Sequence, residues 1–133
     1  MNYWLVKSEP SKYSWEQFVS DGVTQWDGIR NYTARNNLKA MELDDLVLFY
    51  HSNIGLAVVG IAKVVKEHYP DPTAESGDWV AVQLSPIRAL EEPVTLKQIK
   101  QNEHLQNIDL VRLGRLSVVH ISEEEFRIIT EKS

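Results

Sequence analysis

The stretch LVLFYHSNIGLAVVGIAKVV, residues 46–65, indicates the fold more clearly than any other part of the chain. Residues 46–50 form a continuous apolar run of strand length, and residues 56–65 form a second one. Asn53-Ile54-Gly55 lies between the two runs and favours a turn, so we predict two buried strands that are joined directly. Gly60 interrupts the second run, which is typical of a bulge or of a sharp bend such as a barrel corner.

Further elements are predicted on both sides of this hairpin. Three helices begin with an S/T-x-x-E/Q capping box, at Ser14, Thr95 and Ser122, and Asn31 is suited to cap a fourth. The Pro-rich sequence YPDPT, residues 69–73, predicts a rigid loop. We expect helices over 14–20, 31–41, 95–102 and from 122 onward, and further strands over 3–7, 24–26, 79–86 and 116–121.

These elements predict an α+β fold, because several strands follow one another directly and the connections are too irregular for regular βαβ winding. We expect a mixed β-barrel, or a strongly curved sheet, of five or six strands with short peripheral helices. A length of 133 residues suits one core, and the sequence shows no repeat, linker or internal boundary. Residues 1–133 are therefore predicted to form a single domain.

Composition excludes several classes of protein. The chain is 43% apolar and 25% charged, as ordinary globular proteins are, and no apolar run approaches the ~20 residues that a membrane helix needs. The first residues lack the features of a signal peptide, so we expect a cytoplasmic protein with no membrane partner. With no cysteine, and with four histidines in no compact ligand spacing, the sequence predicts neither a metal site nor a cofactor.

Charge is unevenly distributed along the chain. A net charge of −5 argues against a protein that coats duplex DNA by bulk electrostatics. Residues 28–40 nevertheless carry three basic side chains and no acidic one, and residues 110–120 carry two arginines and no acidic residue. Two local basic patches suit a small anionic target better than a long polyanion, although solvated surface charge is the simpler explanation.

No sequence motif of an enzyme is present. The chain has no GxSxG elbow, P-loop or GxGxxG fingerprint. A Ser–His pair, such as Ser8 with His51 or Ser52 with His120, stays open as a nucleophilic site, but no acidic pattern supports it. We therefore predict no catalytic residue and no enzymatic activity.

Aromatic residues offer a second kind of site. Four tryptophans and five tyrosines are many for a chain of this length. Trp4 and Trp15 fall inside regular elements, which predicts core positions, whereas Trp26 stands directly before the Asp27-Gly28 turn. Aromatic faces beside a few polar groups and an arginine are what a flipped base or a single-stranded nucleotide needs. Plain core packing is the alternative.

Six blocks of the sequence, among them WDGIRNYTARNNLKAM, resemble the EVE-domain family, which belongs to the PUA-like superfamily with the YTH and ASCH domains. The blocks cover nearly the whole chain, in order: 3–18, 26–41, 48–53, 59–74, 93–100 and 110–126. The resemblance implies a small PUA-like β-barrel with peripheral helices, which agrees with the fold predicted from the residues. It also implies a non-catalytic nucleic-acid-binding module that reads a modified base, notably a modified cytosine in DNA.

The resemblance implies the residues of the pocket as well. The base pocket would be formed by Lys7, Ser8, Trp26, Arg30, Asn31, His51, Ser52, Tyr69 and Asp71. Phosphate contacts at its rim would come from Arg35, Lys39, Arg112 and Arg115. Thr33 departs from the Gln that is common in the family's N-Y-x-A-R-N, so the preferred base would differ if this position touches the ligand. Trp26 could instead brace the barrel, and Arg30 could pair with Asp27 or Glu9.

The expected partner is therefore a nucleic acid with a modified base, DNA rather than RNA. Two alternatives stay open: a small-molecule or protein-interaction module that uses the same cavity, and a nucleotide-directed hydrolase with a Ser/His/Glu site. The base-reading function predicts that residues from four segments converge on one cleft, although nothing in their local pattern requires it. These residues are Ser8, Trp26, Arg30, Asn31, His51 and Ser52.

Overall fold

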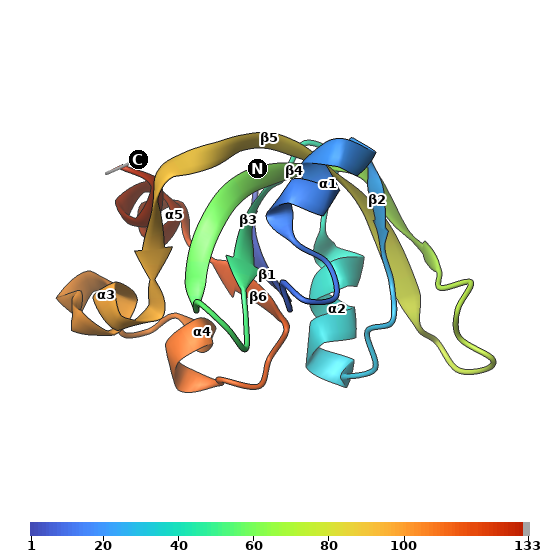
Figure 1. Ribbon diagram of the computed structural model, residues 1–133. Helices are drawn as coiled ribbons and strands as arrows, with labels where there is room; N and C mark the ends of the chain where they lie inside the picture. The colour runs from blue at the N-terminus through green and yellow to red at the C-terminus, as the bar shows by residue number, and fades with distance from the viewer. Residues whose placement is uncertain (132–133) are drawn as a thin grey trace.

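One six-stranded mixed sheet organises residues 1–131, which are the residues that the computed structural model describes (Figure 1). Its strands are β1 (Tyr3–Ser8), β2 (Thr24–Trp26), β3 (Leu46–His51), β4 (Ala57–Pro70), β5 (Val80–Thr95) and β6 (Val118–Ile121). Their order across the sheet is β2-β5-β4-β3-β1-β6, with β1 and β3 parallel and the other neighbours antiparallel. The predicted α+β class with a mixed sheet is confirmed, while the sheet is curved and open rather than closed into a barrel, since β2 and β6 form its two edges.

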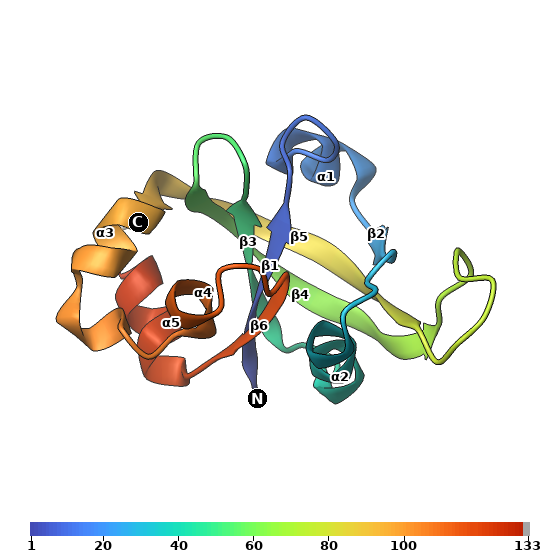
Figure 2. The same ribbon diagram turned by 90° about the horizontal axis from the view of Figure 1, so that it is seen from below.

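Short helices cover the sheet. They are α1 (Trp15–Asp21), α2 (Tyr32–Ala40), α3 (Leu96–Gln101), α4 (Asp109–Arg112) and α5 (Glu123–Thr130), with a 3₁₀ turn η1 over Glu103–Leu105. Figure 2 shows α3, α4 and α5 grouped on one side of β1 and β6, and α2 with the loop between β4 and β5 on the other. No helix within residues 1–131 is long and apolar enough to cross a membrane.

The predicted helix starts are largely confirmed. Asn31 caps α2 by accepting a hydrogen bond from the Ala34 N–H, and Thr95 and Ser122 form complete capping boxes. At Ser14 only half of the box forms, because the Gln17 side chain donates to Asp21 instead of returning to the cap. The turns η1 and α4 were not predicted, since each is only one turn long and α4 lacks a side-chain cap.

The β3–β4 hairpin contains the irregularity that its glycine predicts. The pairing register shifts between Phe49 and Tyr50 on β3 and between Val58 and Gly60 on β4. A Cβ atom on Gly60 would lie 2.4 Å from the Trp15 ring, so the absence of a side chain lets α1 pack directly on the strand. The bend therefore follows from one glycine and one buried indole.

Strands β4 and β5 are longer than predicted. Tyr69 and Pro70 were expected in a loop but end β4, and β5 continues past Pro86 to Thr95. Proline removes a backbone donor and normally ends a strand, which is why the sequence suggested earlier ends. Here Pro86 pairs with Ala62 next to one of the register shifts between β4 and β5, so the ladder continues past it.

The core is aromatic at its centre. Trp4 and Trp15 are buried, as predicted, and Phe49 contacts the rings of Trp15, Phe18 and Trp26.

Within residues 1–131 there is no group of three or more His, Asp or Glu side chains that could hold a metal ion. The last two residues of the predicted domain, 132 and 133, lie outside the described part of the chain.

Candidate nucleic-acid interface

Parallel pairing brings the ends of β1 and β3 together. Ser8 lies opposite His51 in the register, and the Ser52 N–H donates a hydrogen bond of 2.9 Å to the Ser8 carbonyl. The Ser8 hydroxyl donates to the Tyr13 carbonyl at 2.6 Å, and the His51 Nε2 accepts from the Trp15 N–H at 3.1 Å. These two side chains therefore hold the segment that leads into α1.

The imidazole of His51 is kept neutral by this arrangement. Burial lowers the pKa of His51, although the nearby Glu16 carboxylate acts in the opposite direction. A neutral ring is also required for Nε2 to accept the Trp15 N–H. Because the Ser8 hydroxyl and the His51 acceptor are both engaged by backbone groups, the pair is not arranged as a nucleophile and its base.

Trp26 lies at the end of the edge strand β2 and points into the core. Its ring meets Phe49 edge-on at 5.7 Å between centroids and Tyr13 at 6.3 Å. Phe49 also contacts the His51 ring, so Trp26 and His51 lie on the same side of the sheet. Only 8% of Trp26 is exposed, which leaves a margin of the indole rather than an open face for a ligand.

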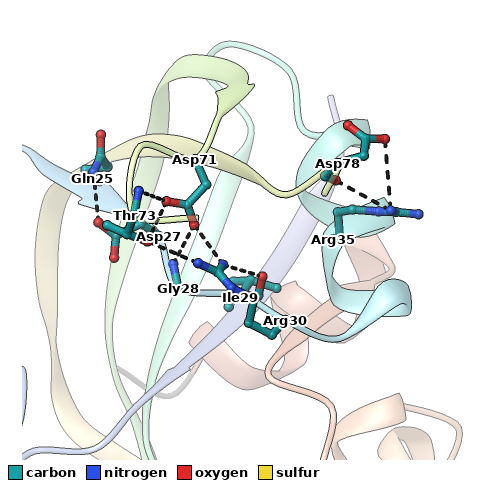
Figure 3. Close-up of polar contacts among 9 residues, drawn as sticks. All are labelled: Gln25, Asp27, Gly28, Ile29, Arg30, Arg35, Asp71, Thr73 and Asp78. Atoms are coloured by element: carbon teal, nitrogen blue, oxygen red, sulfur yellow. Dashed lines mark hydrogen bonds and ion pairs between the residues drawn. The ribbon is translucent and has the colours of Figure 1, made fainter. Parts of the chain in front are cut away.

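Arg30 is held by a buried carboxylate (Figure 3). Asp71 accepts hydrogen bonds from the Gly28 N–H at 2.8 Å, from the Arg30 Nη1 at 3.0 Å, and from both the N–H and the hydroxyl of Thr73. The partner of Arg30 is thus Asp71, and not Asp27 or Glu9. Asp71 lies behind the turn between β2 and α2, where it fixes the direction of the arginine.

The environment of Asp71 stabilises its charged form. Burial by itself would raise the pKa of Asp71, but the bonds from Thr73, Gly28 and Arg30 outweigh it and lower the pKa to about 2. Tyr69, which was predicted beside Asp71 in the pocket, donates its hydroxyl to Gln25 at 2.8 Å. Both residues therefore brace β2 and the turn that follows it.

Two adjoining cavities lie near the ends of β1 and β3 and the start of α2. The first, of about 480 Å³, is lined by Lys7, Ser52 and Arg115, together with Glu9, Tyr50, Asn53, Leu56, Leu96, Lys100, Leu110, Val111, Gly114 and Ser117. The second, of about 350 Å³, is lined by Asn31, Thr33, Leu113, Gly114, Arg115 and Leu116. Gly114 and Arg115 line both, so the two cavities adjoin at these residues.

The structure places four of the predicted residues on the two adjoining cavities: Lys7 and Ser52 on the first, Asn31 on the second, and Arg115 on both. Of the six residues expected to converge on one cleft, only Asn31 and Ser52 line these cavities, one in each. Ser8 and His51 line neither cavity but adjoin Ser52, Ser8 through its backbone hydrogen bond and His51 as the preceding residue. Trp26, Arg30, Tyr69 and Asp71 line neither cavity and support the site from the β2 side.

Positive charge predominates around the first cavity. Three cations, Lys7, Lys100 and Arg115, face one carboxylate, Glu9. The Lys7 ammonium donates to the Gly114 carbonyl at 2.7 Å, and burial lowers its pKa. Hydroxyl and amide groups of Ser52 and Asn53 stand beside these cations, a combination that suits an anionic ligand with a polar edge.

The other predicted phosphate contacts have counterions within the chain. Lys39 and Arg35 on α2 both pair with Asp78, and Arg112 lies 3.4 Å from Asp109 on α4. The Lys39 ammonium, hydrogen-bonded to Asp78, lowers the pKa of that carboxyl. Their charge towards a ligand is therefore partly cancelled, whereas Arg115 forms no ion pair with any residue within 1–131.

Sequence reasoning missed three residues of this region. Tyr13 connects Ser8 to Trp26, and Gly114 and Lys100 line the first cavity beside Lys7. None of the three carries a local signal, because each meets its partners only in the folded chain. Gly114, for example, reaches β1 with the segment 113–117, where the Lys7 N–H donates to the Ser117 carbonyl.

Comparison with known proteins gives consistent matches over nearly the whole chain. The sequence profile of the EVE domain matches residues 2–132. Mouse thymocyte nuclear protein 1 is 35% identical, over 96% of this chain and 72% of that protein. The crystal structure of protein Atu2648 from Agrobacterium tumefaciens is 44% identical, with a TM-score of 0.96 over 98% of this chain and 92% of the other.

Two further structures are informative in different ways. The human THYN1 protein, whose crystal structure is a complex with 5-methylcytosine containing DNA, is 31% identical, with a TM-score of 0.91 over 98% of this chain and 96% of the other. An ASCH protein from Zymomonas mobilis has a TM-score of 0.61 at 13% identity over 98% of each chain, which shows a likeness in fold alone.

Proposed function

The chain belongs to the EVE-domain family, and from that premise we propose that it binds DNA carrying a modified cytosine. The observation that carries this proposal is the human THYN1 structure, in which a relative with the same fold holds 5-methylcytosine containing DNA. The two adjoining cavities support it, because they combine cations for a phosphate with amide and hydroxyl groups for a base edge.

We assign the predicted residues to two roles. Lys7, Asn31, Ser52 and Arg115 contact the nucleotide, since they line the cavities. The second set shapes or supports the walls, since these side chains are buried or bonded to the rest of the fold: Ser8, Trp26, Arg30, His51, Tyr69 and Asp71. Arg35, Lys39 and Arg112 are peripheral phosphate contacts in this proposal.

The proposed function is binding without catalysis. A hydrolase would need a free nucleophile and base, whereas the Ser8 hydroxyl and the His51 Nε2 are bonded to backbone groups of Tyr13 and Trp15. Ser52 and His120 do not form a pair either, since Ser52 is bonded to Ser8 at one end of β1 and His120 lies opposite Trp4 near the other. The ligand is therefore expected to be recovered unchanged. We further propose that residues 1–133 form a single EVE domain, which the match over residues 2–132 supports, while its cytoplasmic location stays a prediction from the sequence.

Binding of two DNA strands that differ only in one 5-methyl group tests the proposal. We expect the unaltered protein to bind the methylated strand about 10-fold more tightly, which is the lower range for one buried methyl or methylene group. Fluorescence anisotropy at fixed low salt measures both dissociation constants, and gel analysis of the recovered strands reports any cleavage or loss of the methyl group.

Arginine variants locate the binding site. Arg115→Ala is expected to weaken binding of both strands about 10-fold or more, the size of a charge-assisted hydrogen bond. Arg127→Ala is the matched control, because the Arg127 side chain is 69% exposed on α5 and pairs only with Glu123 among the described residues. Three outcomes would contradict the proposal. They are equal affinity for the two strands, an effect of Arg127→Ala as large as that of Arg115→Ala, and a strand recovered in altered form.

A further inference from the structure

A second aromatic surface lies outside the cavities. Tyr32, the first residue of α2, is 67% exposed and stacks on Trp79, with 5.2 Å between ring centroids and 20° between planes. Trp79 immediately precedes β5, at the end of the loop from β4. We call these two rings the Tyr32–Trp79 platform.

Arginines accompany both rings. The Arg35 guanidinium lies 5.0 Å from the Tyr32 centroid and 5.7 Å from that of Trp79, and Arg30 lies 5.7 Å from Trp79. These arginines and Lys39 face two carboxylates, Asp71 and Asp78, so cations outnumber acids three to two among these side chains. The platform therefore combines an open ring with a local excess of positive charge, as sites for single-stranded nucleic acids do.

The loop that carries Trp79 positions the indole of the platform. The Trp79 carbonyl accepts a hydrogen bond of 2.9 Å from the Asp71 N–H, which closes the loop between them. Gly77, at φ +92°, lets the chain turn against the indole, since a Cβ atom there would lie 2.8 Å from the Trp79 Nε1. An aromatic surface that is already ordered can stack a base without a further cost in side-chain entropy.

The platform adjoins the second cavity along the chain. Tyr32 stands between Asn31 and Thr33, which both line that cavity, and Arg115 lines it together with the first cavity. A nucleotide in these cavities is covalently joined to the next one along the strand. A base next to one in the second cavity would reach the start of α2, where the Tyr32 ring is exposed.

We propose that the Tyr32–Trp79 platform stacks the base next to the modified cytosine. This inference rests on the proposed function, and extends it from a one-base pocket to a site that requires a neighbouring base on one side. Stacking on an aromatic ring tolerates every base, because each has a π-face, so the platform adds affinity without sequence preference. Its positive charge favours the intervening phosphate.

Abasic substitutions test the platform directly. Three methylated single strands are compared: one intact, one with an abasic site directly 5′ of the 5-methylcytosine, and one with it directly 3′. We expect one of the two abasic strands to bind the unaltered protein about fivefold or more weakly than the intact strand, the lower limit for one base–aromatic stack. The other abasic strand is expected to bind almost as the intact strand does.

Two variants separate stacking from a structural role. Tyr32→Phe keeps the ring, so this variant is expected to bind the abasic strand more weakly than the intact strand, as the unaltered protein does. Tyr32→Leu keeps apolar bulk against Trp79 but has no π-face, so this variant should bind the intact and the abasic strand with equal affinity. If the stack only fastened the loop to α2, Leu would preserve the abasic effect as Phe does. Leu43→Ala, at a residue that is 56% exposed, is the control for loss of exposed apolar surface.

The outcomes distinguish this inference from the function on which it rests. If the unaltered protein prefers the methylated strand but neither abasic site weakens binding, or if Tyr32→Leu keeps the abasic effect, the platform is overturned and the proposed function stands. If the unaltered protein shows no preference for the methylated strand, or binds neither strand, the proposed function fails and this inference fails with it.

Discussion

At the scale of the residue, Asp71 is a buried carboxylate that folding surrounds with four hydrogen-bond donors. Its pKa of about 2 lies below the ordinary value of 3.8, so the folded protein binds its proton less readily than the unfolded chain does. The resulting stabilisation is complete above about pH 5 and is lost as the pH falls from about 4 towards 2. The same bonds hold Arg30 beside Trp79, which links this carboxylate to the proposed DNA surface.

Asp71→Asn is therefore expected to remove a pH-dependent part of the stability. Between about pH 5 and pH 2 the unaltered protein should lose about 2 kcal/mol of unfolding free energy that the variant does not lose. Urea unfolding at several pH values measures the difference. Thr73→Ala removes one donor to Asp71 and should show an intermediate pH dependence; identical pH profiles for all three proteins would contradict the assignment.

At the scale of the element, the bend of the β3–β4 hairpin depends on the contact between α1 and Gly60. The Trp15 ring occupies the space of a side chain on that glycine, and three of its atoms would lie within 2.6 Å of a Cβ atom. Backbone and indole are both buried, so neither has room to move aside.

Gly60→Ala is expected to destabilise the fold by about 1–3 kcal/mol, the usual cost of overpacking a core. The matched control is Gly114→Ala, since a Cβ atom on Gly114 would meet nothing within 4 Å. Urea unfolding of the two variants measures both changes. The double variant Gly60→Ala/Trp15→Ala should be destabilised by less than the sum of the two single variants, because removing the indole makes room for the new methyl group. Full additivity would show that this contact does not limit the substitution.

At the scale of the whole molecule, an acidic protein carries its proposed ligand site at a local excess of cations. The net charge is −5, yet three cations face one carboxylate around the first cavity. Such a protein is expected to contact few phosphates, because bulk repulsion discourages a long track along the DNA backbone.

The salt dependence of DNA binding measures this number. A plot of log Kd against log salt should have a slope of about 1–3, as expected for one to three phosphate contacts, and Arg115→Ala should lower it by about 1. Anisotropy titrations from about 50 to 200 mM salt supply the slope. A slope of about 6 or more would instead indicate extended contact with the backbone, and would contradict a site limited to one or two nucleotides.

The sequence by itself determined most of the elements of this protein, because their signals are local. Apolar runs predict β3 and the start of β4, caps at Asn31, Thr95 and Ser122 mark helix starts, and Gly60 marks the bend. The same local signals predicted a curved mixed sheet, and the family resemblance agreed with it. The resemblance also named Lys7, Asn31, Ser52 and Arg115, which line the cavities.

Only the tertiary structure decided how these residues act, because their partners are far away in the chain. Arg30 finds its carboxylate 41 residues later, at Asp71, and Lys7 donates to a carbonyl 107 residues later, at Gly114. Trp26 has the same sequence context whether its ring faces a ligand or Phe49, and packing against Phe49 buries it. Pairings of this kind depend on which strands and loops the folded chain brings side by side. Local patterns of residues can mark a bend such as the one at Gly60, but they do not say which distant segments meet.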